Sequence, residues 1–334
     1  MAYTSIEICA GAGGQALGLE MAGFNHIALI EYEKDYCNCL RYNRPEWNVI
    51  CMDVRVFDGL SYKGKVDLLA GGVPCPPFSV AGKQLGEDDE RDLFPQMLRL
   101  VEEIEPRIVM IENVRGFLGK QFDDYRELIL HRLNQLKYNV HVGLLNASDY
   151  GVPQLRPRAI VIGVRNDLYD TFTFPQPRFV ENNDVAHAIY DLMAANGWQG
   201  VELWRQQATK IAPTLVGGSK KHGGPDLGPT RARQAWAEMG IDGRGIADNA
   251  PMEDFEGMPR LTPRMMARLQ GFPDDWHFGD RKTVACRMIG NAFPPPVAKE
   301  IGLRIKQVLD NANINSRGKK EVPRRVTGQF SFDH

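Results

Sequence analysis

The stretch Ser5-Ile6-Glu7-Ile8-Cys9-Ala10-Gly11-Ala12-Gly13-Gly14 joins a short apolar run directly to a glycine-rich turn. Leu17, Met21 and Phe24 then recur at helical spacing, and Gly23 marks the end of that helix. A strand, a glycine turn and a helix in this order present backbone N–H groups to a ligand. The turn also fits the G-x-G-x-x-A pattern of dinucleotide sites, although that pattern alone is weak support.

Acidic residues end the next two apolar runs. Residues 27–30 lead into Glu31-Tyr32, and residues 49–52 lead into Asp53. A carboxylate at the tip of the second strand is placed to accept hydrogen bonds from ribose hydroxyls. The simplest alternative for each acid is a solvated strand end or a helix cap. Three strand ends with suitable groups favour a nucleotide-like site.

Strands and helices continue to alternate along the chain. We expect a helix from Leu93 to Glu105, a strand from Ile108 to Ile111 and a helix around residues 125–136. Two more strands are expected at Val140–Ala147 and Ala159–Val164. This order predicts an α/β fold with a doubly wound, mostly parallel sheet and ligands at the carboxyl ends of its strands.

A proline-bounded cysteine follows another predicted strand, residues 66–70. The loop Gly71-Gly72-Val73-Pro74-Cys75-Pro76-Pro77-Phe78-Ser79 gives Cys75 little conformational freedom, because proline restricts both itself and the residue before it. Taken alone, this loop is more typical of a stiff turn than of a site. However, Gly11, Glu31, Asp53, Cys75 and Glu112 would all meet at one sheet edge, which core packing does not require. Residues 80–92 are rich in Gly and acids and predict a mobile lid.

Composition places the chain among ordinary soluble proteins. It has 334 residues, a formal net charge of −2 and six cysteines, none with zinc-like spacing. We therefore expect reduced thiols, no metal and a cytoplasmic protein without membrane segments. The near-neutral charge argues against a whole-protein basic surface for nucleic acid, but allows a local one.

Composition changes near residue 171, and residues 171–257 are rich in Gly and Pro. Helices are expected at Val185–Ala195 and at Arg231–Met239. Basic residues gather around them: Arg205, Lys210, Lys220, Lys221, His222, Arg231, Arg233 and Arg244. Such a set is usually a solvated face, but loops of this kind also suit contacts to DNA.

The last third of the chain ends in two more predicted helices. Thr262-Pro263 opens a short helix that runs to Gln270, and a closing helix follows the prolines at 294–296. After Asn311 the polar, basic tail is expected to fray.

The ordered set of motifs resembles the DNA cytosine-5-methyltransferase family over nearly the whole chain outside residues 171–257. The glycine turn and the Pro-Cys loop are followed by Glu112-Asn113-Val114 and Gln154-Leu155-Arg156-Pro157-Arg158. Leu-Thr-Pro-Arg, Arg-Leu-Gln-Gly-Phe-Pro and Gly-Asn come after them in the family's order. Any one motif is weak, but the ordered set is specific.

The resemblance implies S-adenosylmethionine as cofactor and double-stranded DNA as partner, with no metal. It implies a monomer, nucleoid-associated when bound to DNA, that modifies DNA in a restriction-modification system. The implied domains are residues 1–175 plus 290–334 for catalysis and cofactor binding, and residues 176–289 for target recognition and the hinge. The implied cofactor contacts are Ala10, Gly11, Gly13, Gly14, Glu31, Tyr32, Asp53, Val54, Leu93 and Asn291.

The implied chemistry is addition of the Cys75 thiolate to carbon 6 of a flipped-out cytosine, which makes carbon 5 nucleophilic. Glu112, held protonated in a dry pocket, would donate to ring nitrogen 3. Arg158 would hold the base's carbonyl oxygen, and Arg156 would help to position the loop and a phosphate. Pro74, Asn113 and Gln154 would position the catalytic loop.

The resemblance also assigns recognition residues and exposes departures from the family pattern. Thr214-Leu215 looks like the family's Thr-Leu/Val dipeptide in the recognition domain. DNA contacts are expected from Thr214, Leu215, Lys220, Lys221, Arg231 and Arg233. Unusual residues are Cys9 where Phe is common, Glu7 for Asp, Pro76 for Gln and Met288 for Gln.

Three alternatives remain at this stage. A tRNA cytosine-5-methyltransferase could use the same scaffold, although the long recognition region favours DNA. A dinucleotide-dependent oxidoreductase would explain the glycine turn and Glu31, but not the Pro-Cys loop. A catalytically silent DNA-binding protein would not need every catalytic residue type.

Overall fold

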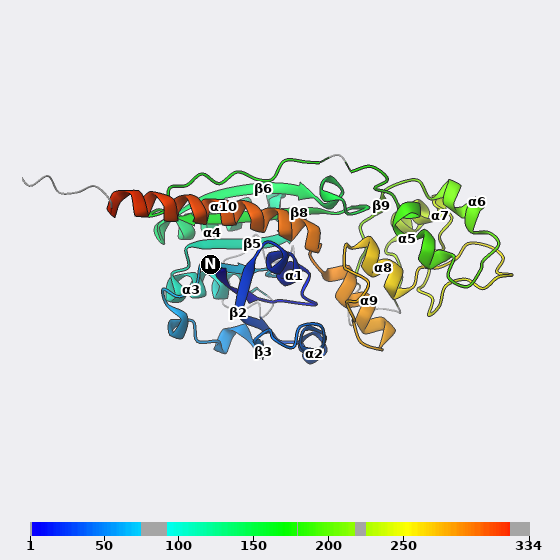
Figure 1. Ribbon diagram of the computed structural model, residues 1–334, viewed down its shortest axis with the longest axis horizontal. Coiled ribbons are helices and arrows are strands. Elements are labelled where there is room, and N and C mark those ends of the chain that lie inside the picture. Colours follow the sequence, from blue (N-terminus) through cyan, green and yellow to red (C-terminus); the bar gives the residue numbers. More distant parts are fainter. Residues whose placement is uncertain (1, 75–91, 179, 218–224, 321–334) are drawn as a thin grey trace, which may run out of the picture.

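A seven-stranded sheet forms the centre of the catalytic part of the computed structural model (Figure 1). The structure describes residues 2–74, 92–178, 180–217 and 225–320. The strand order is β3-β2-β1-β4-β5-β8-β6. The strands are β1 (Tyr3–Ile8), β2 (Phe24–Glu31), β3 (Val49–Cys51), β4 (Leu68–Gly71), β5 (Ile108–Val114), β6 (Tyr138–Asn146) and β8 (Pro157–Arg165).

Only β8 runs against its neighbours. β3, β2, β1, β4 and β5 pair in parallel, whereas β8 pairs antiparallel with both β5 and β6. The predicted mostly parallel, doubly wound sheet is therefore confirmed. The reversal has a consequence for the site, because it places Arg158, at the start of β8, opposite Val114, at the end of β5.

Helices cover both faces of the sheet. Leu19 of α1 and Ile301 and Ile305 of α10 share one apolar cluster with Ile108. On the other face, Met97 of α3 and Ile129 of α4 share an apolar cluster with residues of the strands. The helices of this part are α1 (Gly14–Met21), α2 (Lys34–Asn43), α3 (Phe94–Ile104), α4 (Asp123–Gln135) and α10 (Pro295–Lys320). Short 3-10 turns occupy Val54–Val56, Leu60–Tyr62, Arg115–Leu118, Lys120–Phe122 and Ala147–Tyr150.

Five more helices lie in the described residues between β8 and α10. They are α5 (Val185–Met193), α6 (Val201–Gln207), α7 (Thr230–Glu238), α8 (Pro263–Leu269) and α9 (Lys282–Asn291), and α9 crosses the predicted boundary after residue 289. β9 (Ala212–Pro213), in the predicted recognition part, pairs with β7 (Gln154–Leu155), in the predicted catalytic part. Asp184 and Thr262 cap α5 and α8 through their side chains, because each accepts an N–H of the first turn. None of the described helices is both long and apolar enough to span a membrane.

One apolar cluster joins the two parts of the chain. It contains Leu17 and Leu40 from the first helices together with Trp236, Met266 and other residues of the recognition part. The division into residues 1–175 plus 290–334 and residues 176–289 stays a prediction, since this shared core crosses it.

Several sequence-based expectations about elements were wrong. α10 continues to Lys320, so residues 312–320 are helical rather than frayed, and the rest of the tail lies outside the described residues. Met21 is 50% exposed and Phe24 belongs to β2, because Gly23, with φ of 94°, ends the first helix between them. Leu128 is 42% exposed rather than inward. α2, α6 and α9 were not predicted, since their apolar residues follow no clear period.

Gly18 gives a test of the α1–α10 contact. A Cβ atom there would lie 2.4 Å from Pro295 O and 2.5 Å from the Cβ of Ala298. Gly18→Ala should lower the free energy of unfolding by about 1–3 kcal/mol, because overpacking outweighs the better helix propensity of Ala. Urea unfolding would measure it, with Leu303→Ala, on the exposed side of α10, as the control. A more stable Gly18→Ala variant would contradict the close contact.

Candidate active site

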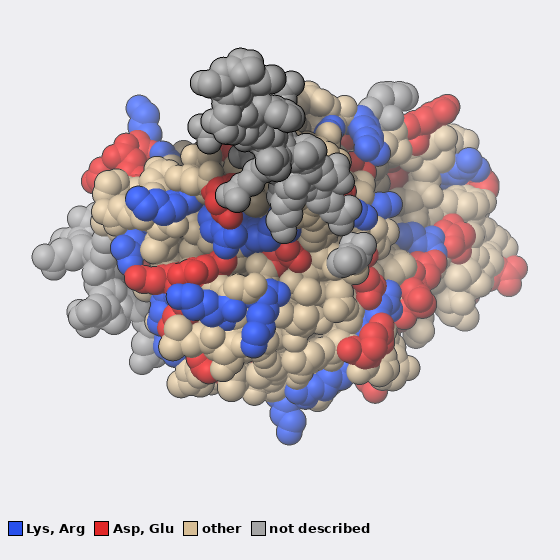
Figure 2. All heavy atoms as spheres, turned by 60° about the vertical axis from the view of Figure 1, so that its left-hand side comes forward, with Lys and Arg blue, Asp and Glu red and all other residues tan. Residues whose placement is uncertain are grey.

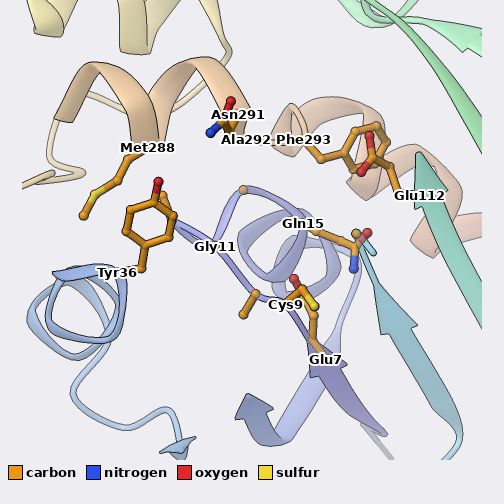
Figure 3. Close-up of a pocket in the computed structure, with 14 residues that line it drawn as sticks. Glu7, Cys9, Gly11, Gln15, Tyr36, Glu112, Met288, Asn291, Ala292 and Phe293 are labelled. Carbon is orange, nitrogen blue, oxygen red and sulfur yellow. The ribbon is translucent and has the colours of Figure 1, made fainter. Parts of the chain in front are cut away.

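A hollow of about 420 Å³ lies at the carboxyl ends of the strands (Figure 3). Figure 3 shows Tyr36 and Met288 on one side of the glycine turn and Glu112 on the other. Of the predicted site residues, Ala10, Gly11, Gly14, Glu112 and Asn291 line it. Further lining residues are Glu7, Cys9, Ala12, Gln15, Tyr36, Gly72, Met288, Ala292 and Phe293.

The turn needs glycine at two positions for different reasons. Gly13 has φ of 85°, and a Cβ there would lie 2.6 Å from Leu40 Cδ2. At Gly14 a Cβ would lie 2.1 Å from Phe293 O. These close approaches hold the backbone of the turn against α2 and the segment after α9, which forms the opposite wall of the hollow.

Glu31 supports the turn from the end of β2. Its Oε2 accepts the N–H of Gly11 at 2.7 Å, and its Oε1 accepts the N–H of Glu33 at 2.8 Å. Burial raises the pKa of Glu31, while these N–H donors act in the opposite direction. Each carboxylate oxygen can accept a further hydrogen bond. The geometry is therefore compatible with the predicted ribose contact.

The remaining predicted cofactor residues lie outside the lining of the hollow. Tyr32 is 69% exposed and Val54 is buried. Asp53 forms an ion pair with Arg55 at 2.7 Å. Leu93 is partly buried against the core. Their cofactor contacts stay predictions.

Glu112 and Arg158 form the ionisable pair of the site. Arg158 Nε lies 2.8 Å from Glu112 Oε1, and both side chains are largely buried. Burial raises the pKa of Glu112, and it outweighs the opposing effect of Arg158 and Arg156. A carboxyl with a raised pKa can hold a proton for donation near neutral pH.

Asn113 fixes the exit of β4 beside this pair. Its Nδ2 donates to Val73 O at 3.0 Å, and its Oδ1 accepts the N–H of Val114 at 2.8 Å. A Cβ on Gly72 would lie 3.0 Å from Glu112 Oε2, so the strand exit passes close to the carboxyl. These contacts support the predicted loop-positioning role of Asn113. Pro74 is exposed, and Cys75 and the predicted lid up to residue 91 lie outside the described residues.

Arg156 and Gln154 join separate segments of the chain. Arg156 is 1% exposed and donates to Leu215 O at 2.8 Å, to Gly290 O at 2.6 Å and to Ala292 O at 3.0 Å. Gln154 Oε1 accepts the N–H of Leu215. Arg156 is therefore enclosed by backbone carbonyls, which supports the predicted positioning of the loop, and its part in positioning a phosphate stays a prediction.

The predicted DNA contacts occupy different environments. Leu215 is 1% exposed, and Thr214 Oγ1 donates to Leu155 O at 2.6 Å. Arg231 is exposed on α7, and Arg233 is partly buried, with Nη2 3.5 Å from Thr230 Oγ1. Lys220 and Lys221 lie outside the described residues. Arg231 is therefore the most exposed of the described candidates, and all of these DNA contacts stay predictions.

Sequence reasoning missed the polar floor of the hollow. Glu7 is 1% exposed and Gln15 is 4% exposed. Within the described part of the chain, Glu7 Oε2 and both amide atoms of Gln15 have no hydrogen-bond partner. Burial raises the pKa of Glu7 well above its usual range, helped by Glu31 and Glu112. Buried polar atoms of this kind suit a polar or cationic ligand. In the sequence, Glu7 stands out only as a departure from the Asp that is usual in the family. No local pattern marks Gln15.

The family model for C-5 cytosine-specific DNA methylases matches residues 3–307. The chain belongs to this family. It is 52% identical over 316 residues to the Type II methyltransferase M.NgoMIV of Neisseria gonorrhoeae, covering 94% of this chain and 100% of that protein. It is also 52% identical over 311 residues to the Type II methyltransferase M.NaeI of Lentzea aerocolonigenes, covering 91% and 75% of the two chains.

Solved structures agree in fold. A proposed prophage-encoded DNA modification methyltransferase from E. coli matches with a TM-score of 0.66 and 25% identity, covering 92% of this chain and 100% of that one. The Entamoeba histolytica methyltransferase EhMeth matches with a TM-score of 0.65 at 15% identity, covering 92% and 99%. The predicted methyltransferase fold and DNA cytosine-5-methyltransferase function are confirmed, and membership implies S-adenosylmethionine as methyl donor.

Surface charge is mixed on the face shown in Figure 2. Basic and acidic side chains are interspersed there, in keeping with a formal net charge of −2. This face is therefore not uniformly basic. Among the described residues, basic groups also pair with acids, as Arg132 does with Glu102 and Arg99 with Glu103.

Glu7 makes stability depend on pH. Its raised pKa means that the folded protein keeps a proton that the unfolded chain releases above about pH 4.3. The free energy of unfolding should therefore fall as pH rises from that value toward the folded-state pKa. Glu7→Gln has no carboxyl to titrate at this position, so its stability relative to wild type should increase as pH rises above about 4.3. Urea unfolding of both proteins would measure this, and a constant difference would contradict it.

Proposed function

We propose that this methyltransferase acts at a specific site in duplex DNA, through a covalent adduct between Cys75 and carbon 6 of the target cytosine. The observation that carries the proposal is the convergence of Asn113 and Glu112 on the exit of β4. Asn113 holds Val73 O, and the Glu112 carboxyl lies beside Gly72, two and three residues before the nucleophile. The chain that leads toward Cys75 therefore passes a carboxyl whose pKa burial raises, which supports the proposal, and Cys75 itself lies outside the described residues.

The hollow fits S-adenosylmethionine. That cofactor carries several hydrogen-bonding groups, and Glu7 and Gln15 contribute buried polar atoms to the lining that make no hydrogen bond within the described residues. The turn at Gly11 and Gly14, supported by Glu31, would hold it from below, and Asn291 from the opposite wall. When bound, S-adenosylmethionine supplies an electrophilic methyl group.

The protein's own groups then activate the base. The target nucleotide must leave the duplex, because a stacked base is out of reach. The Cys75 thiolate adds to carbon 6, and Glu112 protonates ring nitrogen 3, which makes carbon 5 an enamine carbon. Arg158, already beside Glu112, would bind the base's carbonyl oxygen. Transfer of the methyl group to carbon 5 would leave S-adenosylhomocysteine. A solvent base would then take the proton from carbon 5, the thiolate would leave carbon 6, and ring nitrogen 3 would return its proton to the Glu112 carboxylate.

The biological setting proposed is a restriction-modification system. The two relatives described above are named Type II methyltransferases, which supports pairing with a restriction endonuclease. We propose that residues 176–289 choose the site and that the protein acts as a monomer in the cytoplasm, on nucleoid DNA. Bisulfite sequencing of DNA from expressing cells would identify the site, and labelled methyl transfer to tRNA but not DNA would favour the alternative substrate.

Replacement of the nucleophile tests the covalent mechanism. Cys75→Ser should abolish methyl transfer to DNA, because the hydroxyl is a far weaker nucleophile near neutral pH. Binding of S-adenosylhomocysteine, measured by calorimetry, should stay near wild type. Cys51→Ser, at an exposed cysteine, is the matched control and should keep its activity. Methylation by the Cys75→Ser variant would rule out the covalent route.

Replacement of Arg231 tests the recognition assignment. If Arg231 contacts a base edge, Arg231→Ala should reduce the discrimination between the correct and the wrong base at one position by about 1–3 kcal/mol. Arg205→Ala, in the same part of the chain but near Glu202, should leave the site choice unchanged. The readout is the relative methylation rate of duplexes that differ at single positions. An unaltered preference in Arg231→Ala would remove this residue from the recognition set.

A further inference from the structure

Two glycines bring the recognition part into direct backbone contact with the end of α9. A Cβ on Gly217 would lie 2.2 Å from Asn291 Oδ1 and 2.8 Å from Arg287 O. A Cβ on Gly290 would lie 2.3 Å from Gly217 N. No side chain separates these two segments, and close-packed interiors transmit displacement. A shift of Asn291 must therefore move Gly217.

The segment that precedes Gly217 is held just as firmly from the catalytic side. The N–H of Leu215 donates to Gln154 Oε1 at 2.9 Å, and Leu215 O accepts from Arg156 at 2.8 Å. Thr214 Oγ1 donates to Leu155 O at 2.6 Å. Beyond Gly217 the chain continues into residues 218–224, which lie outside the described residues.

Asn291 belongs to the hollow as well as to this contact. It lines the hollow together with Tyr36, Ala292 and Phe293. Figure 3 shows Asn291 above the glycine turn, on the same side as Met288. One side chain thus touches both the cofactor hollow and the recognition segment.

We propose that Gly217 is a positioning residue that couples cofactor occupancy to DNA affinity. This inference rests on the proposed function, in which Asn291 contacts the cofactor. A ligand that fixes Asn291 also fixes Gly217. The protein therefore loses less conformational entropy when it then binds DNA. Thermodynamic linkage requires each ligand to raise the affinity for the other by the same factor. We expect a factor on the order of 5–150-fold.

The coupling can be measured with the unreactive product. The DNA is a duplex carrying the site found by bisulfite sequencing. Its Kd is measured with and without saturating S-adenosylhomocysteine, and the Kd of S-adenosylhomocysteine with and without that duplex. In wild type the two ratios should be equal and well above one. In Gly217→Ala both should fall toward one, because the added Cβ displaces Asn291 and Arg287.

Two further variants complete the experiment. Gly245→Ala adds the same atom in the same part of the chain, where it meets only the mobile end of Arg260 at 3.1 Å, and it should keep the wild-type ratio. Asn291→Ala removes Oδ1 without adding volume. It should lower the ratio even if Gly217→Ala does not fold.

The outcomes separate this inference from the proposed function. A folded Gly217→Ala with the wild-type ratio would overturn the inference, as would a wild-type ratio of one when both ligands bind. Failure of the wild-type protein to bind S-adenosylhomocysteine or DNA at all would overturn the proposed function, and this inference with it.

Discussion

The guanidinium of Arg156 is enclosed among backbone carbonyls from two distant segments, and the geometry of the site depends on it. Its two terminal nitrogens donate to Leu215 O, Gly290 O and Ala292 O. A charge buried to this extent is stable only when hydrogen bonds replace water, so each carbonyl is held where the cation needs it. These hydrogen bonds thereby fix the positions of one wall of the hollow and of the segment at Leu215 relative to the start of β8.

The direction of β8 is the second constraint. Because it runs antiparallel to β5, its first residues lie at the edge where the other strands end. Arg158 therefore meets Glu112 directly, and Arg156, two residues earlier, reaches the segment after α9. A parallel strand in this position would send both arginines to the opposite edge of the sheet. The hollow follows the usual rule, because it lies at the carboxyl ends of the parallel strands. The two arginines beside it come from the start of the antiparallel strand and the residues just before it.

Local sequence patterns were sufficient for much of the fold. The glycine turn, the strand ends at Glu31 and Asp53 and the capped helix after Thr262 were predictable, because turn, cap and periodicity signals act over a few residues. α2 and α9 were not predictable in this way, since they are short and irregular in pattern. Tyr36 and Gln15 were missed for a related reason: nothing near them in the chain marks them as lining a cavity.

The sequence by itself determined the family and its DNA cytosine-5-methyltransferase function, because the ordered set of motifs along the chain is specific. The catalytic roles of Cys75, Glu112 and Arg158 are proposals that follow from that resemblance. Only the tertiary structure showed that Arg156, Gln154 and Leu215 form a buried junction. The reason is physical. Such roles depend on hydrogen bonds across more than fifty residues of chain, such as that between Arg156 and Leu215, and no local pattern records which distant carbonyl a side chain will meet.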